Sequence, residues 1–356
     1  MTATPTAYQA VQLIVWSGTG NTRHVAERMA ATARARGATA RVDTTPTASA
    51  SSPGEKRLLG LMAPTHGFTA PWPLLKAAWT QPDVRGADAF VFVSRGGVRL
   101  AGMTMPGFEG TAAYLPAALL ALRGARLRGC GAVDMPLNWT VMVPTQNQQN
   151  LTAIVAKGQA QTDRFIERLL DGHTAFGGLA QLLLGILILP LSLGYTLIAR
   201  LLLAKMFFAD ERCTSCGTCA KNCPQGAIEL RGRKQLPYWT YDCQNCMRCM
   251  SHCPTDAIQG GQAWLLLYVW LLSLPTGAIA ATALLELAGV SAPWATGVTG
   301  LLTDYAWIVF SVWLTYALLW LGLFVPGLRL VLSRATLTRF YRRYRGPGKA
   351  PGDQSR

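Results

Sequence analysis

The sequence predicts an α/β protein with a doubly wound parallel sheet, a second compact α+β domain and hydrophobic membrane helices. Three observations support this prediction. Short apolar runs alternate with helical stretches over residues 12–171, eight of the nine cysteines fall between Cys213 and Cys253, and three long apolar stretches carry almost no charge. Alternating strands and helices are typical of a parallel sheet covered on both faces. The clustered cysteines indicate a metal site rather than secreted disulfides.

The composition limits the classes of protein that fit. Half of the 356 residues are hydrophobic and only 14% are charged, against about 25% in an average soluble protein. A mainly disordered chain is excluded, and a purely soluble one is disfavoured. The net charge of +15 fits nucleic acid, an anionic membrane face or an acidic partner. Seven basic residues lie between Arg329 and Lys349 with no acid among them. Anionic lipid explains this tail, so we expect membrane lipid and no nucleic acid as a partner.

The N-terminal domain, residues 1–171, is expected to alternate strands and helices. Residues 1–11 lack the basic region and apolar run of a signal peptide, so this domain is expected in the cytoplasm. The stretch 44–55 predicts a surface loop. Apolar runs predict strands at 12–16, 39–43, 58–63, 89–93 and 130–133, and helices are predicted at 21–36, 72–80, 111–123 and 151–170.

A glycine- and hydroxyl-rich loop follows the first strand. Glycines permit a tight turn that brings backbone N–H groups close to an anion, and the next helix begins there with its positive dipole end. The loop has no lysine, so it is not a Walker loop and suits one phosphomonoester better than a triphosphate. The alternative is a polar strand-to-helix turn. The residues of the loop are Ser17, Gly18, Thr19, Gly20, Asn21 and Thr22.

This loop is similar to that of flavodoxins, which carry Ser/Thr-x-Thr-Gly-x-Thr here and bind FMN; the resemblance extends over residues 12–171. It implies a flavodoxin-like sheet with FMN where the strand order reverses. The loops after the third and fourth strands would then flank the flavin. Trp72 and Trp139 could stack on the flavin or pack internally, and His66 could bond to it or be a surface histidine. The flanking residues are Pro64, Thr65, His66 and Gly67, and Ser94, Arg95, Gly96 and Gly97.

Two cysteine runs are repeated at an offset of thirty residues. The pattern Cys-x2-Cys-x2-Cys-x3-Cys-Pro starts at Cys213 and again at Cys243. This is the pattern of bacterial ferredoxins, in which the fourth cysteine ligates the other of two 4Fe–4S clusters. Zinc also uses Cys-x2-Cys pairs, but its sites lack the x2-x2-x3 run. The predicted ligands are Cys213, Cys216, Cys219 and Cys253 for one cluster, and Cys243, Cys246, Cys249 and Cys223 for the other.

The interval between the runs, residues 224–242, leaves room for a small hairpin or helical turn, as in a compact two-cluster domain. Cys130 stands apart and is expected to be a small buried residue. The chain resembles flavodoxin-fused bacterial 2×4Fe–4S ferredoxins over residues 12–171 and 209–262. The membrane segments are outside this resemblance.

Membrane segments are predicted on both sides of the ferredoxin domain 209–262. Residues 263–328 form an expected transmembrane hairpin, and 329–356 a basic cytoplasmic tail, because no Lys or Arg occurs between Arg248 and Arg329. The segment 172–208 is expected to re-enter or lie in the interface, since Pro190 and Gly194 permit a break. A single crossing, which would separate the two redox domains, and a buried soluble helix are the alternatives. The redox domains are thus expected at the cytoplasmic face of the inner membrane.

The combined modules indicate an electron-transfer flavo-iron–sulfur protein. Electrons are expected to pass between FMN, the two clusters and a redox protein partner or a quinone, with the cofactors supplying the redox chemistry. No catalytic residue is identified. The alternative is a flavin-dependent reductase of a quinone or other lipid substrate. A redox sensor is disfavoured because no output domain remains, and no nicotinamide fingerprint is present.

Overall fold

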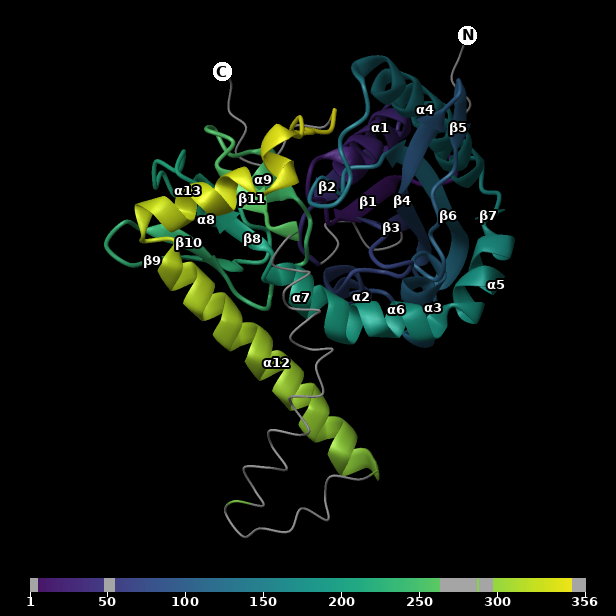
Figure 1. Cartoon of the computed structure of the whole chain (residues 1–356). Helices are drawn as coiled ribbons and strands as arrows, with labels where there is room; N and C mark the ends of the chain where they lie inside the picture. The colour runs from purple at the N-terminus through teal and green to yellow at the C-terminus, as the bar shows by residue number, and fades with distance from the viewer. Residues whose placement is uncertain (1–5, 48–54, 263–286, 288–296, 348–356) are drawn as a thin grey trace. The chain divides into compact units, whose positions relative to one another are not determined.

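The computed structural model describes residues 6–47, 55–262, 287 and 297–347 (Figure 1). The chain divides into two compact units. The sheet unit comprises Met1–Asn138, Thr145–Thr196 and Tyr344–Arg356, and the cysteine unit comprises Trp139–Pro144 and Leu197–Arg343. Residues 263–286 and 288–296 of the predicted hairpin 263–328, and residues 348–356 of the predicted tail, lie outside the described residues.

A seven-stranded sheet forms the centre of the sheet unit. Its order is β2-β1-β3-β4-β6-β7, with β5 paired to β4 outside this path, and only the β4–β5 pair is antiparallel. The strand order reverses between β1 and β3, which creates the switch point where such sheets bind ligands. The strands are β1 (Ala10–Val15), β2 (Thr39–Asp43), β3 (Arg57–Pro64), β4 (Asp88–Leu100), β5 (Met103–Met105), β6 (Arg126–Pro136) and β7 (Ala175–Phe176).

Helices cover both faces of this sheet. On one face α1 (Asn21–Ala35) packs beside α4 (Gln148–Leu170), and on the other α2 (Trp72–Thr80) packs beside α3 (Tyr114–Leu122) (Figure 1). Helix α1 buries Val25, Met29 and Ala33, which recur every four residues and so share one face. They join the strand residues of one apolar core. The predicted parallel α/β sheet is therefore confirmed, including a helix at 72–80.

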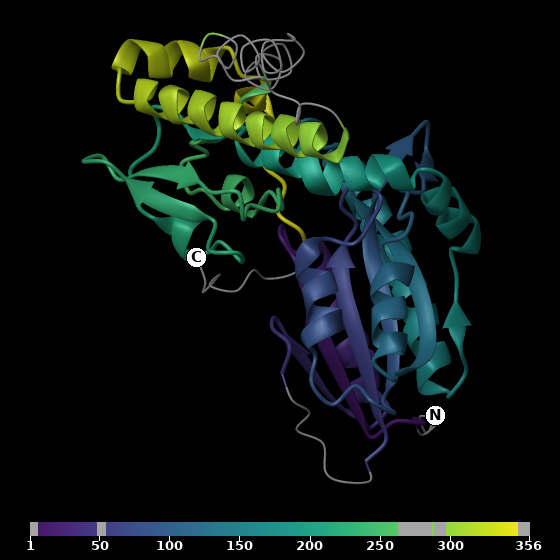
Figure 2. The same cartoon turned by 90° about the horizontal axis from the view of Figure 1, so that it is seen from below.

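Two short helices continue the sheet unit after β7. Helix α5 (Leu179–Leu187) and helix α6 (Leu189–Gly194) meet at an angle of 73° and lie across the end of the sheet that bears the strand arrowheads (Figure 2). Their inner side is close-packed, because a Cβ on Gly185 would lie 2.6 Å from Gly110. Their outer side is apolar and exposed at Leu179, Leu183, Leu184, Ile186, Leu187, Leu189, Leu191 and Leu193.

The cysteine unit contains two small antiparallel strand pairs. Strand β8 (Phe207–Ala209) pairs with β11 (Ile258–Gly260), and β9 (Ile228–Arg231) pairs with β10 (Leu236–Trp239). The β9–β10 hairpin occupies the interval between the cysteine runs, which confirms the prediction of a small hairpin there. The other short elements are the π-helix η1 (Tyr195–Ala199), which begins in the sheet unit, and α7 (Arg200–Ala204), α8 (Thr218–Lys221) and α9 (Arg248–Ser251).

Three C-terminal elements complete the cysteine unit: α12 (Gly297–Gly322), α13 (Pro326–Arg334) and the 3-10 helix η3 (Leu337–Phe340). Within α12, Tyr305–Gly322 is long and apolar enough to cross a membrane. Its C-terminal half is also part of the folded unit, because Tyr316, Trp320 and Leu323 are buried in one cluster with strand side chains. The side chains on its other face, which include Phe310, Trp313, Leu314, Leu318 and Leu321, are exposed.

Candidate functional site

The two cysteine runs have the same backbone conformation thirty residues apart. Ser215 and Asn245 have positive φ values of 58° and 53°, and Gly217 and Met247 have values of 70° and 60°. Such residues turn successive N–H groups toward one point, which suits a negatively charged group. The conformation is costly for a side chain as large as that of Met247, so we infer that the site requires this loop shape.

The thiols of the first run lie near the last cysteine of the second. Burial raises the pKa of Cys213, and the charges of Cys253 and Cys216 raise it further. Burial also raises the pKa of Cys219 to about 12, with contributions from Cys213, Cys253 and Cys216. Cys216 is exposed and hydrogen-bonds to Thr218, which lowers its pKa. These mutual effects indicate that the four thiols are near one another.

A second set of thiols is related to the first by the repeat. Burial raises the pKa of Cys243 to about 12, and Cys246 and Cys223 contribute to this increase. The pKa of Cys246 rises to about 11 through burial and the charge of Cys223, and that of Cys249 rises well above its usual value. These electrostatic effects connect thiols that the sequence assigned to one cluster. Their ligation of iron stays a prediction.

The surroundings of both sets fit iron–sulfur clusters. The backbone N–H groups of Ala227 and Ala257 donate to the sulfurs of Cys223 and Cys253, each at 3.3 Å. Thiolates in such buried places need compensating metal ions. Among the described residues no three His, Cys, Asp or Glu side chains converge on a single metal ion. A four-iron cluster does not need them to, because each thiolate binds a different iron.

Two buried donors lie beside the second set. Within the described residues, Nδ2 of Asn245 has no hydrogen-bond partner, and the indole N–H of Trp239 is directed at the thiol of Cys249. Burial raises the pKa of Cys249, and the indole of Trp239 partly opposes this effect. Buried polar groups are normally satisfied, so an absent acceptor is expected here. The sulfur atoms of a cluster would supply one. The sequence did not identify these residues as part of the site, since neither belongs to the cysteine pattern.

The two sets approach each other at their third cysteines. Cys219 lies on α8 and Cys249 on α9, and these helices pack against each other. The charge of Cys219 contributes to the raised pKa of Cys249. Two clusters held by these thiols would therefore be neighbours, which favours electron transfer between them.

The loop from Ser17 to Thr22 joins β1 to α1 as predicted. Gly20 has a positive φ of 108°, and α1 begins at the next residue. Residues 18–22 are buried. Their polar side chains bond to neighbouring loops: Thr22 Oγ1 lies 2.8 Å from Ser94 Oγ, and Asn138 donates to the hydroxyl of Thr19. These contacts fix the loop at the switch point of the sheet.

The start of the C-terminal tail lies on this loop. The backbone N–H of Gly346 donates to the carbonyl of Thr19 at 2.7 Å, and the hydroxyl of Tyr344 bonds to Oδ1 of Asn21 at 2.5 Å. A Cβ on Gly346 would lie 2.7 Å from the backbone nitrogen of Asn21. The tail backbone thus covers the first N–H group of α1. The sequence assigned the tail to membrane lipid and gave no signal for this contact.

The structure places one group of the other predicted flavin contacts at a turn and the other group within a strand. Pro64 ends β3, and Thr65, His66 and Gly67 form the turn after it. The prediction of a loop at Ser94, Arg95, Gly96 and Gly97 is wrong, because all four lie within β4 and pair with β6. Pairing with β6 extends β4 beyond the apolar run 89–93 from which the strand was predicted. The side chain of Arg95 is held internally, with ion pairs to Glu109 and Asp134.

The turn after β3 and the residue after β1 contain polar atoms that lack partners. The hydroxyl of Thr65 and Nε1 of Trp16 are buried and unbonded within the described residues. The His66 ring packs edge-on against Trp16 with centroids 5.3 Å apart. Burial lowers the pKa of His66 to about 4, so this imidazole is neutral near pH 7. Trp72 is 58% exposed on α2 and Trp139 lies in the cysteine unit.

Comparison with known proteins identifies the cysteine unit. Residues 212–257 match the family model of the 4Fe-4S dicluster domain. No curated protein matches the chain. The match covers both cysteine runs, and it supports iron–sulfur cluster binding and electron transfer by this part of the chain. The cysteine unit therefore carries a ferredoxin-like 4Fe–4S dicluster domain.

Proposed function

We propose that the protein is a membrane-anchored electron-transfer flavoprotein in which FMN and two 4Fe–4S clusters act in series with a redox partner. The dicluster domain is the observation that carries this proposal. Each cluster passes one electron at a time, whereas a flavin can accept two, so the flavin would connect two-electron and one-electron chemistry.

The sheet unit supports FMN as the flavin. The order β2-β1-β3-β4-β6 corresponds to the flavodoxin-like order 2-1-3-4-5, which places a ligand between β1 and β3. The loop 17–22 lies at that point and has one helix N-terminus for one phosphate. The unbonded polar atoms of Thr65 and Trp16 fit a polar ring beside it. Binding at the loop requires Gly346 to move from the backbone of Asn21.

Two features of the described residues support attachment to a membrane. One is the apolar helix segment Tyr305–Gly322, and the other is the exposed leucine-rich side of α5 and α6. Because α5 and α6 are bent by 73° and close-packed on the sheet unit, the interfacial interpretation of 172–208 is favoured over a single crossing. We place both redox domains at the cytoplasmic face of the inner membrane, in line with the basic tail.

A quinone remains a candidate acceptor rather than a substrate with a visible site. The cavity lined by Phe207, Leu319 and Trp320 has a volume of about 10 Å³, roughly the space of one water molecule. It cannot hold a quinone ring. This cavity therefore gives no support to a quinone reductase.

Cofactor analysis of the full chain tests the proposal first. Anaerobic purification should give about eight irons per chain and FMN rather than FAD. Replacing Thr22 with Leu should empty the flavin site and leave the iron content unchanged. Thr152→Leu is the matched control, because Thr152 is exposed on α4 away from the loop. Full FMN occupancy in Thr22→Leu would contradict the assignment of the phosphate site.

Electron flow tests whether the cofactors act in series. Cys216→Ala removes a predicted ligand of the first cluster. In a relay, FMN should still accept electrons from a small chemical reductant, but transfer from FMN to the native partner should stop. A reductase fed directly at FMN should instead keep most of its turnover with an artificial donor. The two outcomes distinguish the relay from the reductase.

A further inference from the structure

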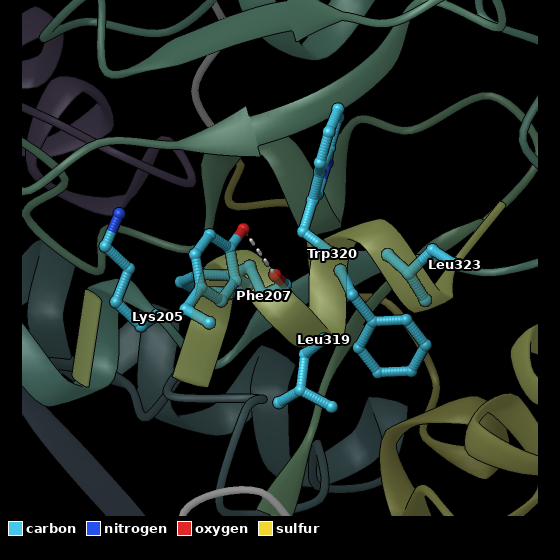
Figure 3. Close-up of a pocket in the computed structure, with 7 residues that line it drawn as sticks. Lys205, Phe207, Leu319, Trp320 and Leu323 are labelled. Atoms are coloured by element: carbon cyan, nitrogen blue, oxygen red, sulfur yellow. Dashed lines mark hydrogen bonds between the residues drawn. The ribbon is translucent and has the colours of Figure 1, made fainter. Parts of the chain in front are cut away.

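Lys205 is a buried lysine in the cysteine unit. It follows α7 as the C-cap residue, and its side chain is only 2% exposed. Figure 3 shows it beside Phe207 at one end of the small cavity, with Leu323 at the other. Lysine is almost never fully buried unless its charge is paired, so this position needs an explanation.

Aromatic rings and one carbonyl surround the ammonium group. Its Nζ lies 4.6 Å from the ring centre of Tyr238, 4.5 Å from that of Tyr241 and 4.6 Å from that of Tyr316. It also donates to the carbonyl oxygen of Trp239. Cation–π contacts of this kind stabilise a desolvated cation. Three rings around one nitrogen indicate that the site holds lysine in its charged form.

No carboxylate pairs with this charge in the part of the chain that the structure describes. The nearest acidic influence among the neighbouring strand residues is Glu229, which forms its own ion pair with Arg231 at 2.5 Å. Arg231 lies over the ring of Tyr238 and adds positive charge. A buried charge without a counter-ion is strongly unfavourable, so a negative group is expected nearby.

Two neighbours connect Lys205 to the second set of thiols. Tyr241, one of the three tyrosines around Lys205, precedes Cys243 by two residues. Trp239 accepts the lysine hydrogen bond at its carbonyl, and its indole N–H is directed at the thiol of Cys249. Burial and the charge of Arg231 lower the pKa of Lys205 to about 8, against the opposing charges of Cys243 and Glu229. The charge of Lys205 likewise opposes the rise in the pKa of Cys243.

We propose that Lys205 is the counter-ion of the cluster held by Cys243, Cys246, Cys249 and Cys223, and that it raises the reduction potential of this cluster. Reduction adds one electron and therefore one negative charge to the cluster. A fixed buried cation stabilises the reduced form more than the oxidised form. Charge and hydrogen bonding around a cluster are the means by which a protein sets its potential. Lys205 is a positioning residue here, since it acts without ligating iron.

Redox titration of the full-length protein, followed by EPR under anaerobic conditions, tests this proposal. Lys205→Gln keeps a donor for the carbonyl of Trp239 but removes the charge. We expect the reduction potential of one cluster to fall by at least about 59 mV, which for one electron is a tenfold change in its reduction equilibrium. Lys205→Arg keeps the charge and should restore most of the potential. The signal that moves should be the one whose spectrum changes in Cys246→Ser.

The control is Lys234→Gln, because Lys234 is exposed in the same domain. It should leave both potentials unchanged. The proposal is refuted if Lys205→Gln leaves both potentials unchanged, or if Lys205→Arg shifts the potential as much as Lys205→Gln does. If Lys205→Gln fails to retain its iron, retention by Lys205→Arg supports the counter-ion role. Loss of iron from both variants refutes the counter-ion role, because cluster retention then depends on the shape of the lysine side chain and not on its charge.

Discussion

Replacing Trp320 with alanine should destabilise the dicluster domain, although Trp320 lies far along the chain in an apolar helix. Its side chain is 8% exposed and packs edge-on against Tyr238 of β10 with ring centres 5.6 Å apart. Its Nε1 donates to the carbonyl of Pro237 at 3.2 Å. Leu323 and Tyr316 belong to the same apolar cluster. The helix is therefore part of the support of the β9–β10 hairpin.

The size of the effect follows from burial. Removing a buried tryptophan side chain costs about 3–5 kcal/mol, including the cavity that it leaves. The carbonyl of Pro237 also loses its donor, which adds about 1 kcal/mol if no water replaces it. At about 2–4 °C per kcal/mol, the first term alone corresponds to a fall of roughly 6–20 °C in the unfolding temperature.

The measurement is thermal unfolding of the detergent-solubilised full chain, followed by loss of the visible absorption of the clusters. Trp313→Ala is the matched control, because Trp313 is on the same helix but 44% exposed. It should change the unfolding temperature by much less. Equal losses in the two variants would show that α12 acts through membrane or detergent contacts and not through the hairpin.

Four further predictions follow from single contacts. Cys253→Ala should damage the cluster of Cys213, Cys216 and Cys219, and selective loss of the other EPR signal would show that the crossover is wrong. In the apoprotein, the pKa of His66 is about 4 when folded and 6.5 in its ordinary state. The unfolded chain therefore binds the proton first, and the free energy of unfolding should fall as pH decreases from about 6.5 to about 4; His66→Gln should weaken this dependence in urea unfolding. A chain that ends after Arg343 should bind FMN faster in stopped-flow fluorescence, since the tail no longer covers Asn21; slower binding would mean that the tail completes the site. Topology reporters should indicate the cytoplasm after Thr44, Gly232 and Pro347 and the outside near Ser291, and an external signal at Gly232 would establish a single crossing at 172–208.

Local patterns predicted most of the sheet unit and the repeat of the cysteine runs. Strands and helices with strong periodicity, such as 58–63 and 72–80, lie within two residues of their predicted ends. The spacing of the cysteine repeat reflects a duplicated backbone, visible in the matching φ angles at Ser215 and Asn245, and the assignment of the ligands stays a prediction. These features depend on residues that are close in sequence, so sequence patterns can predict them.

Features that depend on distant residues were not predicted. Ser94 to Gly97 look like a loop in sequence, but pairing with β6 makes them part of a strand. The contact of Tyr344 with Asn21 joins residues more than 300 positions apart. Lys205 follows an apolar run of sequence, but three tyrosines from later parts of the chain surround its ammonium group. In each of these three cases, residues distant in sequence determine the structural role, and the local sequence pattern does not.

The position of α12 restricts how the proposed membrane segments can be separated from the dicluster domain. Val312, Tyr316 and Trp320 recur every four residues and are buried, while Leu314 and Leu318 on another side of the helix are exposed. One helix thus has a face for the dicluster domain and a face available to lipid. A truncation near Gly261 removes both faces, and it also removes Thr338, whose hydroxyl accepts from the backbone of Gly260 at 3.0 Å. Loss of electron transfer in that truncation would not identify a membrane acceptor, because the domain itself is left incomplete.

Replacing the exposed residues Phe310, Leu314, Leu318 and Leu321 with polar ones is the sharper test. It keeps the buried face, so it separates contact with lipid from support of the clusters.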